Sequence, residues 1–390
     1  MVKTHKPLEV SILEEISGIP TAPFYEELVY RYLNNFFEKF EKNPCISFKR
    51  DEYGNMVVHY EGNLNSKNRN LAYIVHTDHP AFHLKTTENG ELLANRVGGL
   101  NQGIVTPGSH VNLHKITEKG VNSSLGEIVK KTKLGEYVIK PAERGNFSFA
   151  TLNVERFNIG SDSVIRAPVL DDYAGISITL ATFTEIVEKG VPINLYLIFH
   201  RAEEAGFAGA YGAILEEDLP RDCIVYSVEA SPYIKKENSE IRKIAEMGGG
   251  IVIRTGDRCT VDYDTTAINL LKEASVGLKN VKEARMDGGT CEASLYYAKG
   301  YRTAGICLPI SGHHNDGMLE GINKPVVEGV HLSDLLAGKD LMVSVIERLG
   351  SYPNAYSYFE KHRITKEQTK LVESVKFFFR NHTKEMLTSL

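Results

Sequence analysis

Histidine and carboxylate residues recur in this sequence at the points where apolar segments end. Four short apolar runs are typical of buried strands, and each leads into side chains that can bind a metal ion or move a proton. The runs and the residues after them are 71–75 with His76 and Asp78, 193–199 with Glu203 and Glu204, 223–228 with Glu229, and 304–310 with His313 and His314. Because ligands of open α/β sheets bind beyond the carboxyl ends of the strands, we expect these groups to meet at one edge of a sheet.

A pair of aspartates, Asp171 and Asp172, adds a fifth contribution just before an expected helix, whose N-terminal end favours negative charge. A mixture of imidazole and carboxylate groups suits zinc, cobalt or manganese better than calcium, which prefers oxygen ligands alone. The five cysteines are scattered, odd in number and without a CxxC pair, which argues against thiolate ligands and a disulfide framework. The sequence therefore predicts a centre for divalent metal ions.

The number of candidate groups fits two ions and one free base. Two neighbouring ions need a bridging carboxylate, one histidine each, one further carboxylate each, and a shared water that they make more acidic. A carboxylate not bound to metal must then take the proton of that water, and the pair Glu203 and Glu204 can supply one ligand and one general base. Asp78 can accept the N–H of His76 and fix its tautomer. The expected chemistry is hydrolysis by a metal-activated water whose proton the free carboxylate passes to the leaving amine.

Helix and strand patterns alternate on both sides of a block with a different composition. The expected helices are 23–40, 174–187, 209–215, 265–278, 291–298 and 330–349, and a strand pair is expected around 53–60. This order predicts an α/β fold with a doubly wound, mostly parallel but mixed sheet and helices on both faces. Residues 85–166 lack helical periodicity and are expected to form an inserted small β-rich domain. The catalytic domain would then comprise 1–84 and 167–390, with a helical tail at 351–390.

Composition excludes several other classes of protein. The chain has 390 residues, of which 42% are hydrophobic, so it can bury a large core. Its 45 Lys and Arg against 50 Asp and Glu leave no basic surplus for nucleic acid. Residues 1–16 lack the apolar core of a secretory signal, and no apolar run approaches the roughly 20 residues that span a bilayer. We expect a cytoplasmic protein with no membrane contact.

The order of the motifs resembles one family of enzymes. The strings HTDHPAF, VLDDYAG, RAEEAGFAGA, SVEAS, DGGTCEA and LPISGHHND are similar to the motif series of the co-catalytic metallo-aminopeptidases of the tetrahedral (TET), glutamyl and deblocking type. These are relatives of the zinc exopeptidases of the carboxypeptidase G and leucyl aminopeptidase kind. The likeness covers most of the chain, including the β-rich insertion. It implies an exopeptidase that acts near the N-terminus of peptides with two divalent ions per subunit, zinc being expected and cobalt or manganese being alternatives.

The resemblance also implies a role for each candidate residue. His76, Glu204, Glu229 and His314 would bind the ions, Asp171 would bridge them, Glu203 would be the general base, and Asp78 would orient His76. Asp171 is favoured over Asp172 because Gly175 follows it at the family's spacing, and His314 is favoured over His313 by its distance from Pro309. The family pattern further implies an unusual, cis peptide bond before Asp172. In this family the inserted domain makes subunit contacts, which implies a homo-oligomer.

Other interpretations stay open at this point. Glu229 stands where aminopeptidases of this type usually have Asp and where related carboxypeptidases and deacylases often have Glu, so a metallo-carboxypeptidase or N-acyl amino acid deacylase is the alternative enzyme. The altered strings HTDHPAF and GGTCEA suggest, as a second alternative, a non-catalytic homologue acting in binding or assembly. Asp171 and Asp172 could instead cap the following helix, and His313 and His314 could lie in a plain turn.

Overall fold

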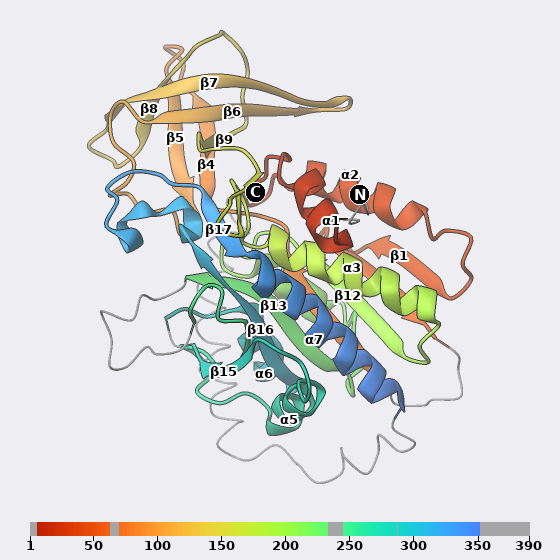
Figure 1. The fold of residues 1–390 in the computed structure, drawn as a ribbon. Coiled ribbons are helices and arrows are strands. Elements are labelled where there is room, and N and C mark those ends of the chain that lie inside the picture. Colours follow the sequence, from red (N-terminus) through yellow and green to blue (C-terminus); the bar gives the residue numbers. More distant parts are fainter. Residues whose placement is uncertain (1–5, 63–69, 233–244, 287, 352–390) are drawn as a thin grey trace, which may run out of the picture.

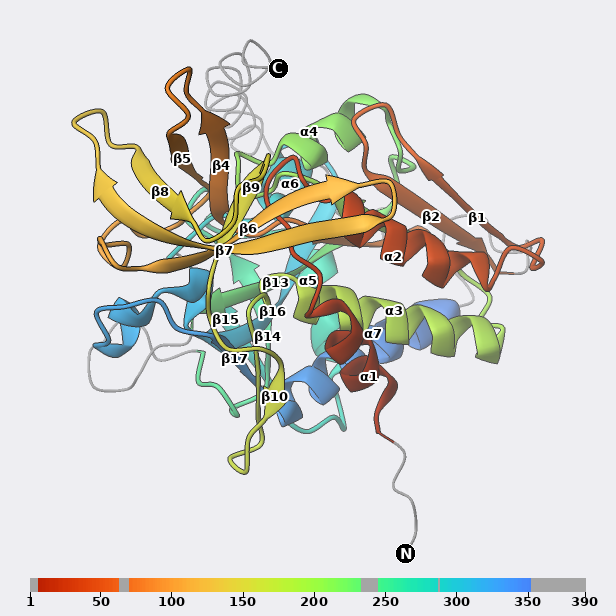
Figure 2. The ribbon, with the colours of Figure 1, turned by 90° about the horizontal axis from the view of Figure 1, so that it is seen from above.

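The computed structural model describes residues 6–62, 70–232, 245–286 and 288–351 (Figure 1). The amphipathic helix predicted in the tail, at 365–378, lies outside these residues. Within them, the chain forms a large mixed sheet with helices packed against it and a separate, smaller barrel (Figures 1 and 2). The α/β class and the separate β-rich unit agree with the sequence analysis.

The large sheet has a parallel centre and antiparallel margins. Its strands are ordered β1 (Ile46–Arg50), β2 (Met56–Glu61), β12 (Asn194–His200), β3 (Asn70–His76), β13 (Ile224–Pro232), β16 (Arg302–Ser311), β17 (Glu328–His331), β11 (Val164–Ala167) and β10 (Asn158–Ile159), and β14 (Ile251–Gly256) and β15 (Val281–Arg285) branch from β16. Only β12, β3, β13 and β16 form the parallel centre, and β14 and β15 make one further parallel pair. The sheet is thus mixed, with less parallel pairing than the sequence pattern predicted.

Strand β3 shows why the sheet is covered on both faces. All of its residues from Leu71 to His76 are buried, and successive side chains point to opposite faces. Leu71, Tyr73 and Val75 share a core with residues of α1 (Leu8–Ile16), α2 (Glu27–Glu38), α3 (Tyr173–Lys189), α5 (Thr265–Ala274) and α7 (Leu332–Ser351). Ala72 and Ile74 pack instead with α4 (Ala208–Leu215) and α6 (Glu292–Ala298).

Most helices and central strands lie where the sequence placed them. The exceptions are α1, β1, which lies before the strand pair expected around 53–60, the short strands β14, β15 and β17, and the pair β10 and β11, which falls in the block predicted to be a separate β-rich unit. The last pair joins the large sheet through β17. These elements are short, so their own periodicity is too brief to identify them.

A closed barrel is formed by β4 (Ala81–Thr86), β5 (Leu92–Val97), β6 (His110–Thr117), β7 (Gly120–Lys131), β8 (Tyr137–Pro141) and β9 (Phe149–Leu152). It has its own apolar core, which includes Phe82, Val111 and Ile139. The hairpin of β6 and β7 reaches over α2 (Figure 2), where Arg31 donates hydrogen bonds to the carbonyls of Thr117 and Glu118. The barrel strands cover residues 81–152, and the domain limits at 84 and 167 stay a prediction.

No helix in the described part of the chain has the length and apolar character that crossing a membrane would require.

Candidate metal centre

The parallel register of the central strands brings His76 and Glu229 together. The ladder between β3 and β13 runs in register up to Ile74 and Ser227, and two positions further along each strand stand His76 and Glu229. Their side chains are in contact, with His76 Nε2 3.3 Å from Glu229 Oε1. Glu229 lies inside β13 and is buried, so its carboxylate needs a partner.

Asp171 completes this first group of donors. Its Oδ1 lies 3.1 Å from His76 Nε2, and His76, Asp171 and Glu229 together could hold an ion. Asp171 follows β11 in the loop that leads into α3. The donors therefore come from two neighbouring strands and a loop, which brings together residues that are far apart in the sequence.

The other oxygen of Asp171 faces a second group. Its Oδ2 lies 3.0 Å from His313 Nε2 and 3.3 Å from His314 Nε2, and these three residues form a second set that could hold an ion. His314 Nε2 also lies 2.8 Å from Glu204 Oε1. Both histidines of the pair thus reach Asp171, and His314 has the additional contact with Glu204.

Asp172 has a different environment from Asp171. Its Oδ1 accepts the N–H of Gly175 and caps the N-terminus of α3, while Oδ2 is buried and has no hydrogen-bond partner among the described residues. The peptide bond between Asp171 and Asp172 is cis, as the motif resemblance implied. The capping interpretation therefore describes Asp172, whereas Asp171 faces the histidines.

Glu203 and Glu204 lie on a loop that Asp78 holds in place. The carboxylate of Asp78 accepts the backbone N–H of Glu203 at 2.9 Å and that of Glu204 at 3.0 Å. Its distance from His76 Nδ1 is 3.7 Å, and that nitrogen lies closer, at 3.2 Å, to the backbone oxygen of Asp78. Asp78 therefore contacts the Glu203 loop more closely than it contacts the imidazole that it was expected to orient.

The electrostatics of the site follow from burial and crowding. Burial raises the pKa of Glu203 well above its ordinary value, and Glu229, Glu204 and Glu292 add to this rise while His76 opposes it. Burial also raises the pKa of Glu229, to about 7. For Asp171 burial acts in the same direction, but hydrogen bonding to His313, His314 and His76 lowers its pKa well below the usual range.

The donor set fits divalent ions on its chemistry. Two donor groups share Asp171, and all their contacting atoms are imidazole nitrogens or carboxylate oxygens. Buried carboxylates outnumber the imidazoles that could neutralise them, and the pKa of Asp172 is raised well above its usual value by burial, then by Glu229 and Asp171. An ion would supply the positive charge that this group of acids lacks.

The sequence analysis missed Glu328, a buried residue of β17 that joins three parts of the site. One carboxylate oxygen accepts the N–H groups of Leu170 and Asp171, and the other accepts the N–H of His314 and lies 3.1 Å from His79 Nε2. Glu328 thereby fixes the backbone on both sides of the second donor group. A lone glutamate in the apolar run 325–330 was the available signal, since a buried carboxylate requires partners.

A loop of the barrel also reaches the site. The backbone oxygen of Gly99, which follows β5, lies 3.3 Å from His314 Nδ1, and its N–H points to Glu204 Oε2 at 3.4 Å. A Cβ atom at Gly99 would lie 2.4 Å from the ring of His314. The close approach of backbone to imidazole therefore requires glycine.

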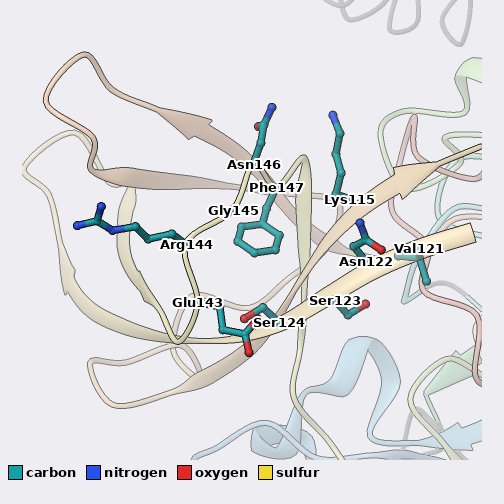
Figure 3. A pocket seen from close by; sticks show the side chains of 10 residues that line it. All are labelled: Lys115, Val121, Asn122, Ser123, Ser124, Glu143, Arg144, Gly145, Asn146 and Phe147. Carbon is teal, nitrogen blue, oxygen red and sulfur yellow. The ribbon is translucent and has the colours of Figure 1, made fainter.

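A pocket elsewhere on the barrel is separate from this centre. It is lined by Lys115, Val121, Asn122, Ser123, Ser124, Glu143, Arg144, Gly145, Asn146 and Phe147 (Figure 3). None of the candidate metal or catalytic residues is among them.

Comparison with known proteins gives a family match over part of the chain and a fold. Residues 144–321 match the M42 glutamyl aminopeptidase family. Three solved structures share the fold at low identity. The TET1 peptidase of Pyrococcus horikoshii, which can assemble into a tetrahedron or a large octahedral shell, has a TM-score of 0.68 and 20% identity, with 87% of this chain and 99% of that chain covered.

The other two are aminopeptidases of archaea. The enzyme from Desulfurococcus kamchatkensis has a TM-score of 0.72 and 16% identity, covering 87% of this chain and 94% of its own. The TET aminopeptidase from a marine sediment thaumarchaeote has a TM-score of 0.71 and 17% identity, covering 87% and 97%. No curated protein matches the chain in the sequence search.

Proposed function

We propose that the chain is a two-metal exopeptidase, and therefore a hydrolase, that removes residues from the N-terminus of peptides. The match of residues 144–321 to the M42 glutamyl aminopeptidase family and the fold shared with TET-like aminopeptidases support this proposal. One observation carries this proposal: the two oxygens of Asp171 face two different donor groups, one with His76 and one with His314. A carboxylate in this position can bridge two ions.

We assign the ligands by these contacts. His76 and Glu229 would hold one ion, Glu204 and His314 would hold the other, and Asp171 would be shared. When bound, the ions, for which zinc suits the mixed donor set and cobalt or manganese are alternatives, would polarise the scissile carbonyl and acidify water. His313 and Asp172 remain the alternate ligands, because His313 also reaches Asp171 and Asp172 adjoins it.

The chain's own residues would move the proton. Glu203 lies beside the donor groups with a pKa raised well above its ordinary value, first by burial. Such a carboxylate can accept the proton of the attacking water and donate it to the leaving amine. Asp78 contributes by holding the N–H of Glu203, so that the base has a fixed position. In this assignment Asp78 is a positioning residue.

The alternative that Glu229 suggests is a carboxypeptidase or N-acyl amino acid deacylase. Glutamate has one methylene more than aspartate, yet its carboxylate reaches His76 without displacing Asp171. This geometry is compatible with either end of a peptide as substrate. The choice between them therefore requires an assay.

The test is a substrate panel on enzyme saturated with zinc, cobalt or manganese. Aminoacyl p-nitroanilides with a free amine should be hydrolysed, whereas N-acylated dipeptides should not. Glu203→Gln should keep its metal while kcat falls by about 10²–10⁴-fold, the usual contribution of a general base. Turnover of the blocked substrates alone would favour the deacylase or carboxypeptidase, and no turnover with both ions bound would favour a binding or assembly protein.

We also propose that the chain forms a homo-oligomer, because the Pyrococcus horikoshii structure of the same fold assembles into closed shells. Size-exclusion chromatography with light scattering tests this, and a monomer at micromolar concentration would contradict it. The cytoplasmic location stays a prediction.

A further inference from the structure

The loop that carries Glu203 is held by side chains from three other segments. Four consecutive backbone N–H groups, from Arg201 to Glu204, each donate to a buried side-chain oxygen. Arg201 donates to Asn55 Oδ1, Ala202 to Glu26 Oε1, and Glu203 and Glu204 donate to the two oxygens of Asp78. Backbone N–H groups that leave a strand have no ladder partner, so these acceptors define the path of the loop.

Among these acceptors, Glu26 is a buried carboxylate that accepts several hydrogen bonds. It belongs to the N-terminal segment before α2, is 1% exposed, and accepts hydrogen bonds from Phe24, Ala202 and Arg201. Ala202, whose N–H it accepts, has a φ of 50°. The left-handed region is sterically unfavourable for a non-glycine residue, so this conformation needs an outside contact to hold it.

We propose that Glu26 is a positioning residue that sets the conformation of the loop 201–204 and thereby aims Glu203 at the substrate. This inference rests on the role proposed above for Glu203. Glu26 acts through the N–H of Ala202, the residue immediately before the base. The role of Glu26 depends mainly on a side chain long enough to bring one oxygen to the N–H of Ala202. It depends less on the negative charge of the carboxylate.

Two substitutions of Glu26 separate the effect of side-chain length from the effect of charge. Glu26→Gln keeps an oxygen that can accept from Phe24 and Ala202 but loses the ion pair with Arg201, which is 3.1 Å away. Glu26→Asp keeps the charge but shortens the side chain, so its oxygen no longer reaches Ala202. The Gln variant therefore keeps the acceptor that the proposal requires, whereas the Asp variant keeps only the charge.

The kinetic experiment compares these variants as metal-saturated full-length enzyme. We expect Glu26→Gln to keep kcat within about 3-fold of the wild type and Glu26→Asp to lose about 10- to 100-fold, because small misplacements of a catalytic group reduce rates on that scale. KM should change by less than about 3-fold in both, since the substrate-binding surface is intact. Glu26→Ala should resemble the Asp variant, and if it does not fold, the Gln and Asp pair still decides.

A second measurement does not depend on catalysis. Hydrogen exchange of peptides covering residues 200–205 should be at least about tenfold faster in Glu26→Asp than in the wild type, and unchanged in Glu26→Gln. Glu27, the next residue and the first of α2, gives a matched control, because its half-exposed carboxylate pairs with Arg31 and Arg50, away from the loop. Glu27→Asp and Glu27→Gln should change neither kcat nor exchange.

An Asp variant that matches or exceeds the Gln variant in kcat and in protection would overturn the proposal, as would exchange that is equal in all variants. If the wild type hydrolysed no peptide, the proposed function would fail, and the exchange data would still decide the role of Glu26.

Discussion

His76 Nε2 lies 3.1 Å from Asp171 Oδ1, although 95 residues separate the two in the chain. The other oxygen of Asp171 faces His313 and His314. A single carboxylate thus contacts two groups of side chains that could each hold a metal ion, and the next residue, Asp172, serves as a helix cap. The two adjacent aspartates therefore have different contacts, and their replacement should have different effects.

Replacement of Asp171 by Asn should reduce the bound metal from two ions per chain to one or fewer, because a neutral amide is a poor bridge between two cations. Activity should fall with it by at least about 10³-fold, since the proposed reaction uses both ions. Asp172→Asn is the matched control: an Asn side chain can still accept the N–H of Gly175. Metal analysis by mass spectrometry compares them, and equal metal loss in both variants would contradict the assignment of Asp171.

Gly99→Ala should disturb His314 from the side of the barrel. The added methyl group would lie 2.4 Å from the imidazole ring, so either the ring or the barrel loop must move. We expect affinity for the second ion to fall by at least about tenfold, because residues that orient a metal ligand contribute on this scale. Competition with a chromogenic chelator measures the affinity. Gly18→Ala, which adds a methyl group where no atom lies within 4 Å, should bind metal normally, and normal binding by Gly99→Ala as well would refute the prediction.

Removal of metal should destabilise the fold. Buried carboxylates repel one another when no cation is bound. Five acidic residues converge in the site: Asp171, Asp172, Glu203, Glu204 and Glu229. An ion present at 1,000 times its dissociation constant stabilises the folded state by about 4 kcal/mol. Differential scanning calorimetry before and after chelation should show a lower Tm for the chelated protein and recovery on adding zinc. An unchanged Tm after chelation would mean that a bound metal ion does not stabilise the fold.

The barrel should lose stability in mild acid through His114. Burial lowers the pKa of this residue from 6.5 to about 4, and its ring nitrogens lie near the hydroxyls of Ser123 and Thr151. The unfolded chain therefore binds the proton first as pH falls below 6.5, and stability present above that pH is lost towards pH 4, by about 3 kcal/mol in total.

Urea unfolding at a series of pH values measures this loss by circular dichroism. His114→Gln should show a shallower decline between pH 6.5 and 4 than the wild type. His110, an exposed residue on the same strand, gives the control, and His110→Gln should follow the wild type. A parallel decline in His114→Gln and the wild type would exclude His114 as the source.

Much of the candidate site could be predicted from the sequence because its signals are local. A short apolar run followed by His76, or by Glu203 and Glu204, marks the end of a buried strand, and the ends of neighbouring parallel strands meet. The six motifs supported the resemblance to M42 and TET aminopeptidases, which the family match confirms. The prediction of a mixed α/β sheet with a separate β-rich unit is likewise confirmed.

Other features depended on contacts between distant segments. Glu26, Asn55 and Glu328 stand in stretches with no chemical motif, and their roles arise only because folding brings buried acceptors to N–H groups elsewhere. The order of the strands outside the parallel centre could also not be predicted from the sequence. Strands as short as β10 and β17 have too few residues for the alternation of apolar and polar side chains to be recognised.

The sequence by itself indicated candidate metal ligands and the apolar runs that lead to them, because hydrophobic periodicity and motif spacing are properties of neighbouring residues. Only the tertiary structure decided how those groups are divided: Asp171 towards the histidines and Asp172 as a cap, and both His313 and His314 within reach of the same carboxylate. The physical reason is that side-chain positions depend on strand register and on backbone hydrogen bonds to remote acceptors, and those interactions join residues that sequence patterns cannot relate.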